Sequence, residues 1–255
     1  MLSFVNFKSG SKGNSTLISN GKTNVIIDLG ITKRCLTHEL AALNLTLDNI
    51  DGVLFTHEHT DHLLPLSIGI FKNDKLYATQ YTIKTITYNT VNYFLPFIIG
   101  SLKITPLETS HDAINPCGYL IEDTLSNESL VYLTDTGIIF EHLGEYILNR
   151  TYYILESNHN RKLLALNPNY PLFLKDRIMG DCGHLSNKEA ALVLFKYTGD
   201  QTKLVALAHL SEENNSAEQA LLDHAMFYFK MTKKKTFPYK LICLKQSETT
   251  NSAYL

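Results

Sequence analysis

The stretch His57-Glu58-His59-Thr60-Asp61-His62 follows an apolar run, Val53-Leu54-Phe55-Thr56, that has the composition of a buried strand. Four metal-binding side chains in six positions cannot all lie on one face of a regular helix or strand. They require a tight loop, and crowding them together without a ligand would leave polar groups unsatisfied. Imidazole nitrogens and carboxylate oxygens suit zinc, and also manganese or iron. The stretch therefore predicts a site for a pair of divalent metal ions.

Size and composition set outer bounds on the function. The 255 residues carry a formal net charge of −2, which gives no overall attraction to nucleic acid or to a membrane surface. The four cysteines are widely spaced, which argues against a disulfide framework and favours a reducing, cytoplasmic compartment. The N-terminus reads as a strand, not as a leader, and the apolar stretches are too short to cross a membrane. No linker divides the chain, so we expect one domain over residues 1–255.

The pattern of apolar residues predicts alternating strands and helices. Strands are expected at 2–7, 15–18, 24–28, 52–56, 76–78, 102–107, 118–122, 130–134, 152–155, 203–208 and 241–244. Helices are expected at 32–43 and 138–148, and after capping signals at Ser186 and Ser216. The polar tail 246–253 is expected to be loose. This order favours an α/β protein with two sheets packed face to face and helices outside, a four-layer αββα sandwich.

Three more residues of metal-ligand type follow predicted strands. His111 comes after the strand 102–107, Asp135 after 130–134 and His209 after 203–208. Loops converge at the carboxyl ends of strands while the sheet holds them rigid. Each residue taken alone has an ordinary interpretation, and Asp135 could simply cap a helix. Together with the His57–His62 stretch, they predict one shared site.

This set of residues, His57-x-His59-x-Asp61-His62 with His111, Asp135 and His209, resembles the metallo-β-lactamase fold superfamily. The stretches 9–15, 111–113, 115–119, 156–159, 183–187 and 208–215 resemble its WalJ (YycJ-like) branch. That branch is a family of 5′→3′ DNA exonucleases. The resemblance implies a metallo-β-lactamase-type αββα sandwich, a metal-dependent hydrolase of phosphodiesters, and DNA as partner. Asp135 and His209 are 209 − 135 = 74 residues apart, too close for the β-CASP insertion of RNA-processing relatives.

The resemblance also implies how two divalent ions would be held. Carried over by motif, one ion would be bound by His57, His59 and His111, the other by Asp61, His62 and His209, with Asp135 bridging. Two ions about 3.5–4 Å apart can share a water molecule and lower its pKa toward neutrality. The resulting hydroxide would attack phosphorus in line. Catalysis is thus expected to depend on Asp61, as a ligand, and on His184.

His184 is the candidate general acid, because the equivalent histidine of superfamily phosphodiesterases gives a proton to the leaving oxygen. A departing alkoxide is very basic, so such help is worth about 10²–10⁴-fold in rate. The alternative is that His184 only braces its loop. Glu156 and His159 are expected either to orient His184 or a metal ligand, or to play a structural role.

Local basic residues are the candidate contacts to the DNA backbone. Arg161, Lys175 and Arg177 lie in or beside a segment that also contains Tyr170 and Phe173. Lys12 lies in the glycine-rich stretch 9–15, which we interpret first as a tight turn near the metal site and second as a phosphate contact.

Two other functions share part of this pattern. A phosphodiesterase for small cyclic or nucleotide substrates would use every ligand and His184, but would bind its substrate in a closed pocket. A thioester or lactam hydrolase would need neither an alkoxide-protonating histidine nor a path for a polyanion. His184 and the long 158–183 loop count against it.

Overall fold

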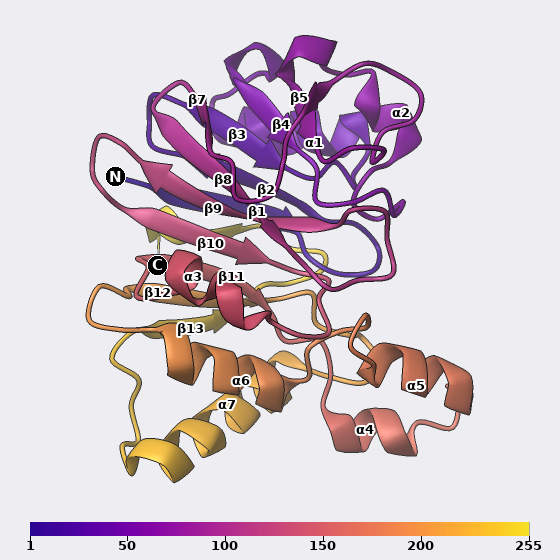
Figure 1. Ribbon diagram of the computed structural model, residues 1–255, viewed down its shortest axis with the longest axis vertical. Coiled ribbons are helices and arrows are strands. Elements are labelled where there is room, and N and C mark those ends of the chain that lie inside the picture. Colours follow the sequence, from indigo (N-terminus) through magenta and orange to yellow (C-terminus); the bar gives the residue numbers. More distant parts are fainter. Residues whose placement is uncertain (255) are drawn as a thin grey trace. The chain divides into compact units, whose positions relative to one another are not determined.

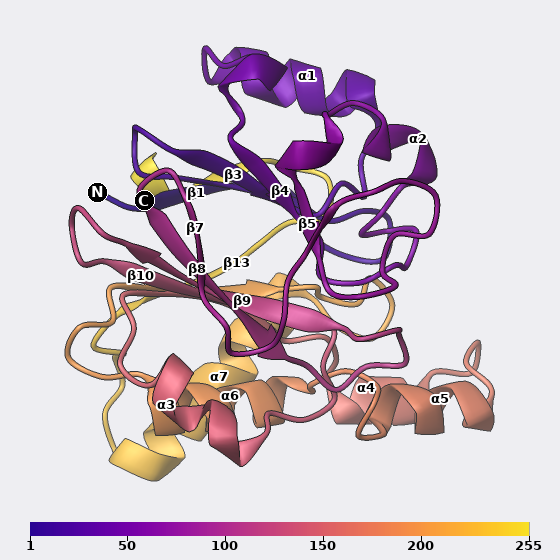
Figure 2. The same cartoon turned by 45° about the horizontal axis from the view of Figure 1, so that its top comes forward.

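The computed structural model describes residues 1–254, which form two compact units. Unit 1 contains residues 1–108, 113–129 and those from 245 on, and unit 2 contains residues 109–112 and 130–244. The strands belong to two mixed sheets, and Figures 1 and 2 show the elements of each unit. The single domain over residues 1–255 stays a prediction, and its last residue, Leu255, lies outside the described residues.

Unit 1 contains a sheet with the strand order β14-β1-β2-β3-β4-β5-β6. Pairing is antiparallel from β14 to β3 and parallel from β3 to β6. These strands are β1 (Ser3–Lys8), β2 (Ser15–Ser19), β3 (Asn24–Ile27), β4 (Gly52–Leu54), β5 (Leu76–Ala78), β6 (Asn89–Thr90) and β14 (Thr250–Asn251). The unit also contains three antiparallel strands, β7 (Phe97–Ile99), β8 (Leu102–Glu108) and β9 (Cys117–Asp123).

Helix α1 (Lys33–Ala42) covers one face of the first sheet, as Figure 2 shows, and the short helix α2 (Pro65–Ile68) follows the His57–His62 loop. Short 3-10 turns occur at Leu47–Asn49 and Asn73–Lys75, and a further one, Ser252–Tyr254, follows β14. Leu36 and Leu40 of α1 are fully buried in a core with Val53 and Phe55, which come directly before that loop in the chain. The apolar face of α1 therefore helps fix the strand from which the loop departs.

Unit 2 contains four parallel strands in the order β10-β11-β12-β13. They are β10 (Ser129–Leu133), β11 (Tyr152–Glu156), β12 (Leu204–Ala208) and β13 (Lys240–Cys243). The helices are α3 (Gly144–Ile147), α4 (Arg161–Leu166), α5 (Leu172–Met179), α6 (Asn187–Tyr197) and α7 (Ala217–Thr232), with a 3-10 turn at Glu141–Leu143. Helices α6 and α7 lie side by side on one face of these strands (Figures 1 and 2). Among residues 1–254, no helix is long and apolar enough to cross a membrane.

Two of the predicted helices begin where the capping signals place them. The Ser186 hydroxyl accepts a hydrogen bond from the Glu189 amide in a complete capping box, and Ser216 caps α7 through the Gln219 amide. The helix predicted at 138–148 is wrong in its extent, because only residues 141–147 are helical. Thr136 explains the late start, since its hydroxyl donates at 2.6 Å to the Ile138 carbonyl that a longer helix would use.

The expectation of a loose polar tail over residues 246–253 is wrong for residues 250–253. Residues Thr250–Asn251 form β14, which pairs with Val5 and Asn6 of β1. The Ser252 hydroxyl accepts a further hydrogen bond from the Phe4 amide at 2.8 Å. An unpaired strand edge leaves a row of backbone donors and acceptors exposed, and the tail satisfies that edge. Backbone pairing of this kind needs no apolar side chains, which is why composition did not predict it.

The buried His224 of α7 gives a prediction for stability against pH. Its side chain is 2% exposed and its Nε2 lies 3.1 Å from the Ser157 hydroxyl. Burial lowers its pKa to about 4, against the opposing charge of Asp223. Because the unfolded chain protonates this histidine near pH 6.5, the folded protein should lose stability as pH falls from about 6.5 to about 4. The contribution reaches about 3 kcal/mol at the lower end.

Urea unfolding of His224→Gln and of the unaltered protein at several pH values between 7 and 4 checks this. The variant should show a flatter decline in the free energy of unfolding over that range. His38 is exposed, so His38→Gln is the matched control and should leave the decline as it was. Parallel declines for His224→Gln and the unaltered protein would contradict the assignment.

Candidate functional site

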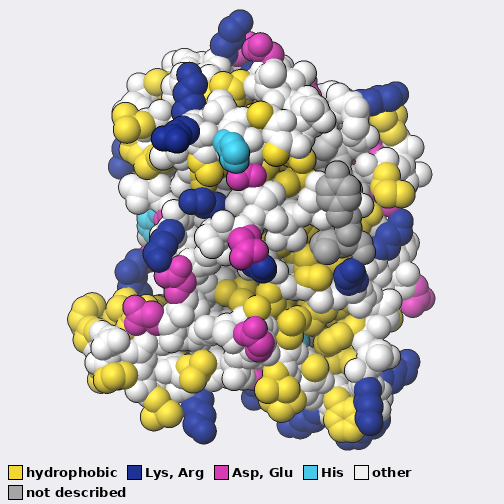
Figure 3. All heavy atoms as spheres, turned by 180° about the vertical axis from the view of Figure 1, so that it is seen from behind, with side chains coloured by type: hydrophobic (Ala, Val, Ile, Leu, Met, Phe, Trp, Pro, Cys, Tyr) yellow, Lys and Arg dark blue, Asp and Glu magenta, His cyan; other side chains and the backbone are white. Residues whose placement is uncertain are grey.

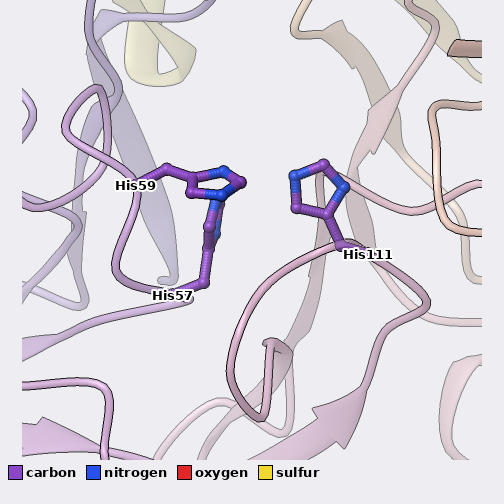
Figure 4. A group of neighbouring side chains, drawn as sticks. All are labelled: His57, His59 and His111. Atoms are coloured by element: carbon purple, nitrogen blue, oxygen red, sulfur yellow. The ribbon is translucent and has the colours of Figure 1, made fainter. Parts of the chain in front are cut away.

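The first group of candidate ligands lies in unit 1, on the loop that follows β4. The amides of His62 and Leu63 both donate to the carbonyl of His59, which closes the loop into a tight turn. His57 and His62 are buried, and the ring centroid of His57 lies 4.6 Å from that of His59 and 4.2 Å from that of His62. Figure 4 shows the His57 and His59 side chains on this loop, and His111 on a separate loop. The predicted crowding of imidazoles in one turn is confirmed.

A buried carboxylate, Asp28, holds the ring of His62. The Asp28 side chain is fully buried after β3, and its Oδ2 lies 2.7 Å from Nδ1 of His62. The same carboxylate accepts hydrogen bonds from the amide and the hydroxyl of Thr56. Burial raises the pKa of Asp28, while the charge of His62 and these hydrogen bonds lower it. With Nδ1 donating to Asp28, Nε2 of His62 carries the lone pair, as a metal ligand requires.

The glycine-rich turn at 9–15 packs against the His57–His62 loop. The amide of Asn14 donates to the Asp61 carbonyl at 2.7 Å, and its side-chain nitrogen lies 2.8 Å from Nε2 of His62. Gly30 permits this close approach, since a Cβ there would lie 1.6 Å from the Asp61 carbonyl oxygen. The interpretation as a tight turn next to the candidate ligands is confirmed. Coordination by Nε2 of His62 requires the Asn14 side chain to rotate away.

We expect Asp28→Ala to weaken metal binding about 10–100-fold, because the ring of His62 loses the partner that fixes its orientation and tautomer. Competition with a chromogenic chelator measures the affinity. Asp48→Ala, an exposed position in the same unit, is the control for loss of a carboxylate. Equal metal affinity in Asp28→Ala and the unaltered protein would remove Asp28 from this role.

The second group of candidate ligands lies in unit 2, beyond the carboxyl ends of the parallel strands. Asp135 follows β10, Glu156 ends β11, His209 follows β12, and His184 precedes α6. These four residues offer ligand atoms that all lie within 4.8 Å of one another. Asp135 and His209 both have φ of 53°, in the left-handed region that residues other than glycine seldom adopt. The left-handed backbone after β10 and after β12, the two strands that flank β11, turns both side chains to the same place.

Asp135 is the common neighbour of three imidazoles in this unit, those of His111, His184 and His209. Its Oδ1 lies 3.5 Å from Nε2 of His209 and 3.9 Å from Nε2 of His111. It also lies 3.7 Å from Nδ1 of His184. A carboxylate among three imidazoles is placed where it could contact two metal ions, as a bridging ligand must.

Glu156 orients two of these imidazoles from a fully buried position. Its Oε1 lies 2.7 Å from Nδ1 of His184 and 3.1 Å from Nδ1 of His209, and its Oε2 accepts the amides of Thr136 and Leu185. Four donors around one carboxylate compensate the cost of burying its charge. Because Nδ1 donates to Glu156 in both rings, Nε2 of each remains for other chemistry.

The charges of this group shift the pKa of its members in opposite directions. Burial alone would lower the pKa of His184, but the charge of Glu156, the hydrogen bond to it and the charge of Asp135 raise it. Burial would raise the pKa of Glu156, but His184 and the hydrogen bonds hold it below its usual range. For His111, burial lowers the pKa despite the opposing charge of Asp135. His184 is thus favoured as a proton carrier, whereas His111 is favoured as a neutral ligand.

Comparison with known proteins places this chain in a family. The model of the Beta-lactamase superfamily domain matches residues 23–209. The chain belongs to the beta-lactamase superfamily. It is 32% identical over 226 residues to Exodeoxyribonuclease WalJ of Streptococcus pneumoniae strain D39, covering 83% of this chain and 82% of that protein. It is 31% identical over 235 residues to Exodeoxyribonuclease YycJ of Bacillus anthracis, covering 86% of each.

Solved structures of the superfamily share the fold. The metallo-beta-lactamase fold protein YhfI of Bacillus subtilis matches with a TM-score of 0.69 and 16% identity, over 98% of this chain and 99% of that one. The short form of human tRNase Z matches with a TM-score of 0.64 and 12% identity, over 97% of this chain and 98% of that one. The predicted α/β fold class, of the metallo-β-lactamase type, and the predicted superfamily and branch are confirmed.

Two of the four predicted basic contacts, Arg161 and Arg177, are paired with acidic residues. Arg161 pairs with Glu189 at 2.5 Å, and Arg177 pairs with Asp112, whose neighbour is His111. The Lys175 ammonium donates to the Ala165 carbonyl at 2.8 Å. Lys12 is exposed on the glycine-rich turn. Contact of these four residues with DNA stays a prediction. The two arginines present less uncompensated positive charge than the sequence implied.

His159 occupies an unexpected environment. It is 1% exposed, and within residues 1–254 neither of its ring nitrogens has a hydrogen-bond partner. Its backbone pairs with Ser186 at the start of α6. The predicted role of orienting His184 or a ligand has no hydrogen bond to support it and stays a prediction, whereas Glu156 does contact His184 directly.

Sequence reasoning missed two residues that shape the candidate ligands. Asp28 follows β3 directly, the same position after a strand that pointed to His111, Asp135 and His209, so this signal could have found it. Asn14 gives no such signal, because its contact with His62 depends on the fold of two segments far apart in the chain.

Proposed function

We propose that this protein is a dinuclear metal-dependent phosphodiesterase that degrades DNA from the 5′ end. The observation that carries the proposal is the Glu156–His184 pair beside Asp135 and His209, a proton donor fixed next to candidate metal ligands. Two relatives above 30% identity are named exodeoxyribonucleases, which supports DNA as the substrate class.

The donor set fits two divalent ions, zinc or manganese, with iron also suitable. In this proposal the ligands of one ion are His57, His59 and His111, those of the other are Asp61, His62 and His209, and Asp135 bridges. The carboxylates of Asp28 and Glu156 accept from the Nδ1 atoms of His62 and His209, the arrangement that metal-binding histidines adopt. When bound, the ions would activate water and stabilise charge on the phosphate.

His184 is proposed to complete the reaction by giving a proton to the leaving oxygen. Its Nδ1 donates to Glu156, so the proton to be transferred is the one on Nε2. The charge of Glu156 stabilises the imidazolium before transfer, which keeps the ring ready as an acid at neutral pH. The four cysteines are free, which supports the proposal of a reducing, cytoplasmic location.

The test of this function uses duplex DNA that carries a label at one 5′ end or at one 3′ end, with manganese or zinc. A 5′→3′ exonuclease releases labelled mononucleotide at once from the 5′-labelled strand, while the 3′-labelled strand shortens gradually. Single-stranded DNA, RNA and bis(p-nitrophenyl) phosphate are run in parallel. Immediate release of mononucleotide from the 3′ label would contradict the proposed polarity, and hydrolysis of the generic ester without DNA cleavage would contradict the substrate.

A second candidate function is a phosphodiesterase for small cyclic or nucleotide substrates. The observation that favours it is the neutralisation of both Arg161 and Arg177 by carboxylates, which weakens the expected path for a polyanion. Cyclic nucleotides added to the same assay distinguish the two functions.

The DNA path can be tested at Arg161. If its guanidinium contacts the phosphate backbone, Arg161→Gln should weaken duplex binding and lower the salt dependence of the binding constant by about one phosphate contact. Glu189→Gln breaks the same ion pair but keeps the cation, so it should not weaken binding. Equal weakening in both variants would assign Arg161 a structural role.

A further inference from the structure

A pocket of about 360 Å³ in unit 2 lies apart from the candidate ligands. It is formed by the segment His159–Lys162, the start of α6 and the second half of α7, and we call it the α6–α7 pocket. The described residues that line it include neither a proposed metal ligand nor His184. Its volume lies in the range of about 300–1,000 Å³ that is typical of small-molecule sites.

The floor of the α6–α7 pocket is apolar. Met226, Phe227 and Met231 of α7 line it, and the ring of Phe227 is packed edge to face against Phe195 of α6 at 6.3 Å. A half-buried aromatic ring and two flexible thioethers form a surface on which a planar ring can pack. Met226 and Met231 are about half exposed (54% and 48%), so this floor is open to solvent.

Three lysines, Lys162, Lys188 and Lys230, give the lining of the pocket its positive charge. They come from α4, α6 and α7, and Arg161 of α4 also lines the pocket but is paired with Glu189. The single carboxylate in the lining, Asp223, accepts hydrogen bonds from Asn160, Asn187 and Gln219. At the foot of Figure 3, basic and hydrophobic side chains lie beside one another on unit 2.

A buried polar side chain, His159, is a second indication of a ligand that does not depend on the charge of the pocket. His159 lines the pocket, is 1% exposed, and makes no hydrogen bond through either ring nitrogen within residues 1–254. Burying a polar group without a partner is costly, so such a group calls for a partner that the protein itself does not supply. A neutral imidazole offers one donor and one acceptor, which suits the polar atoms of a small molecule.

We propose that the α6–α7 pocket binds a small molecule that joins a planar ring to a phosphate, such as a nucleoside 5′-monophosphate. The ring packs against Phe227 and the methionines, and the phosphate faces Lys162, Lys188 and Lys230. The ring nitrogens of His159 are buried beside the pocket, so a rotation of that ring would supply a further polar contact to the ligand. The apolar side chains suit the ring and the cationic side chains suit the phosphate, so the proposed ligand carries both parts. The choice of a nucleotide rests on the proposed function, because an exonuclease releases nucleoside monophosphates.

The protein contains four methionines, which gives a local probe of this pocket. In metal-loaded full-length protein labelled with ¹³C at the methionine methyls, deoxyadenosine 5′-monophosphate should shift the signals of Met226 and Met231 in a saturable way. The signals of Met1 and Met179, which lie outside the pocket, should stay in place. Inorganic phosphate and deoxyadenosine, added separately, should each bind at least tenfold more weakly.

The charge reversal Lys188→Glu with Lys230→Glu should weaken nucleotide binding at least tenfold. Lys234→Glu with Lys235→Glu makes the same change of charge at exposed positions outside the pocket and should leave binding unchanged. Unshifted Met226 and Met231 signals, or equal affinity in both double variants, would overturn the proposal. Equal affinity for phosphate alone would overturn the role of the ring.

Failure of this inference is separable from failure of the proposed function. Hydrolysis of bis(p-nitrophenyl) phosphate reports the metal centre alone, and the Lys188→Glu/Lys230→Glu variant should retain it. A protein that hydrolyses phosphodiesters but shows no nucleotide shift at Met226 disproves only the pocket. A protein that shows the shift but hydrolyses no phosphodiester disproves only the function.

Discussion

His184→Ala should lower the turnover of DNA about 10²–10⁴-fold and leave the metal content unchanged. The reason is that His184, held by Glu156 at 2.7 Å, supplies the proton for a strongly basic leaving oxygen. Elemental analysis of the purified variant measures the metal, and initial rates measure turnover. Loss of metal from His184→Ala would show that this histidine is a ligand and not the acid.

The leaving group provides a second readout for His184. An ester that releases p-nitrophenolate needs little protonation, so the same variant should lose much less activity on it than on DNA. A residue that only braces its loop would lower both rates alike. His142 is exposed, and His142→Ala is the control for removal of an imidazole.

Asp135→Ala should differ from His184→Ala by losing metal as well as turnover. Removing the proposed bridging carboxylate takes away a ligand of both ions, so metal affinity should fall by more than the 10–100-fold typical of an outer contact. Turnover should fall about 10³-fold or more, since bound metal contributes several kcal/mol of transition-state stabilisation. Metal titration and rates at saturating manganese or zinc measure the two effects.

Asp200, exposed at the turn before β12, provides the control, and Asp200→Ala should keep both properties. Chelation of the unaltered protein should reproduce the Asp135→Ala rate, and added metal should restore only the unaltered protein. Full activity in Asp135→Ala after such treatment would contradict the bridging role.

The fold was predictable where periodicity and caps act locally. The strands at 76–78 and 152–155 and the helix starts after Ser186 and Ser216 agree closely with the structure. The late start of the helix near Ile138 and the pairing of Thr250–Asn251 with β1 were not predictable, because both depend on hydrogen bonds that no short window of sequence displays.

The candidate site was predictable in its residue types but not in its supports. Residues after strands pointed to Asp135 and His209, yet their left-handed backbone could not be seen in advance, since neither is a glycine. The ion pairs of Arg161 and Arg177 depend on Glu189 and Asp112, which are distant in sequence. The buried and unpartnered state of His159 within residues 1–254 likewise emerges only from the folded chain.

The return of the chain from unit 2 to unit 1 at residue 245 has a consequence for biosynthesis. During translation β1 emerges long before its partner β14, because nearly all the other elements lie between them in the chain. Until then one edge of β1 stays uncovered, and an open edge invites pairing with neighbouring nascent chains. Truncation before residue 245 would make that vulnerability permanent.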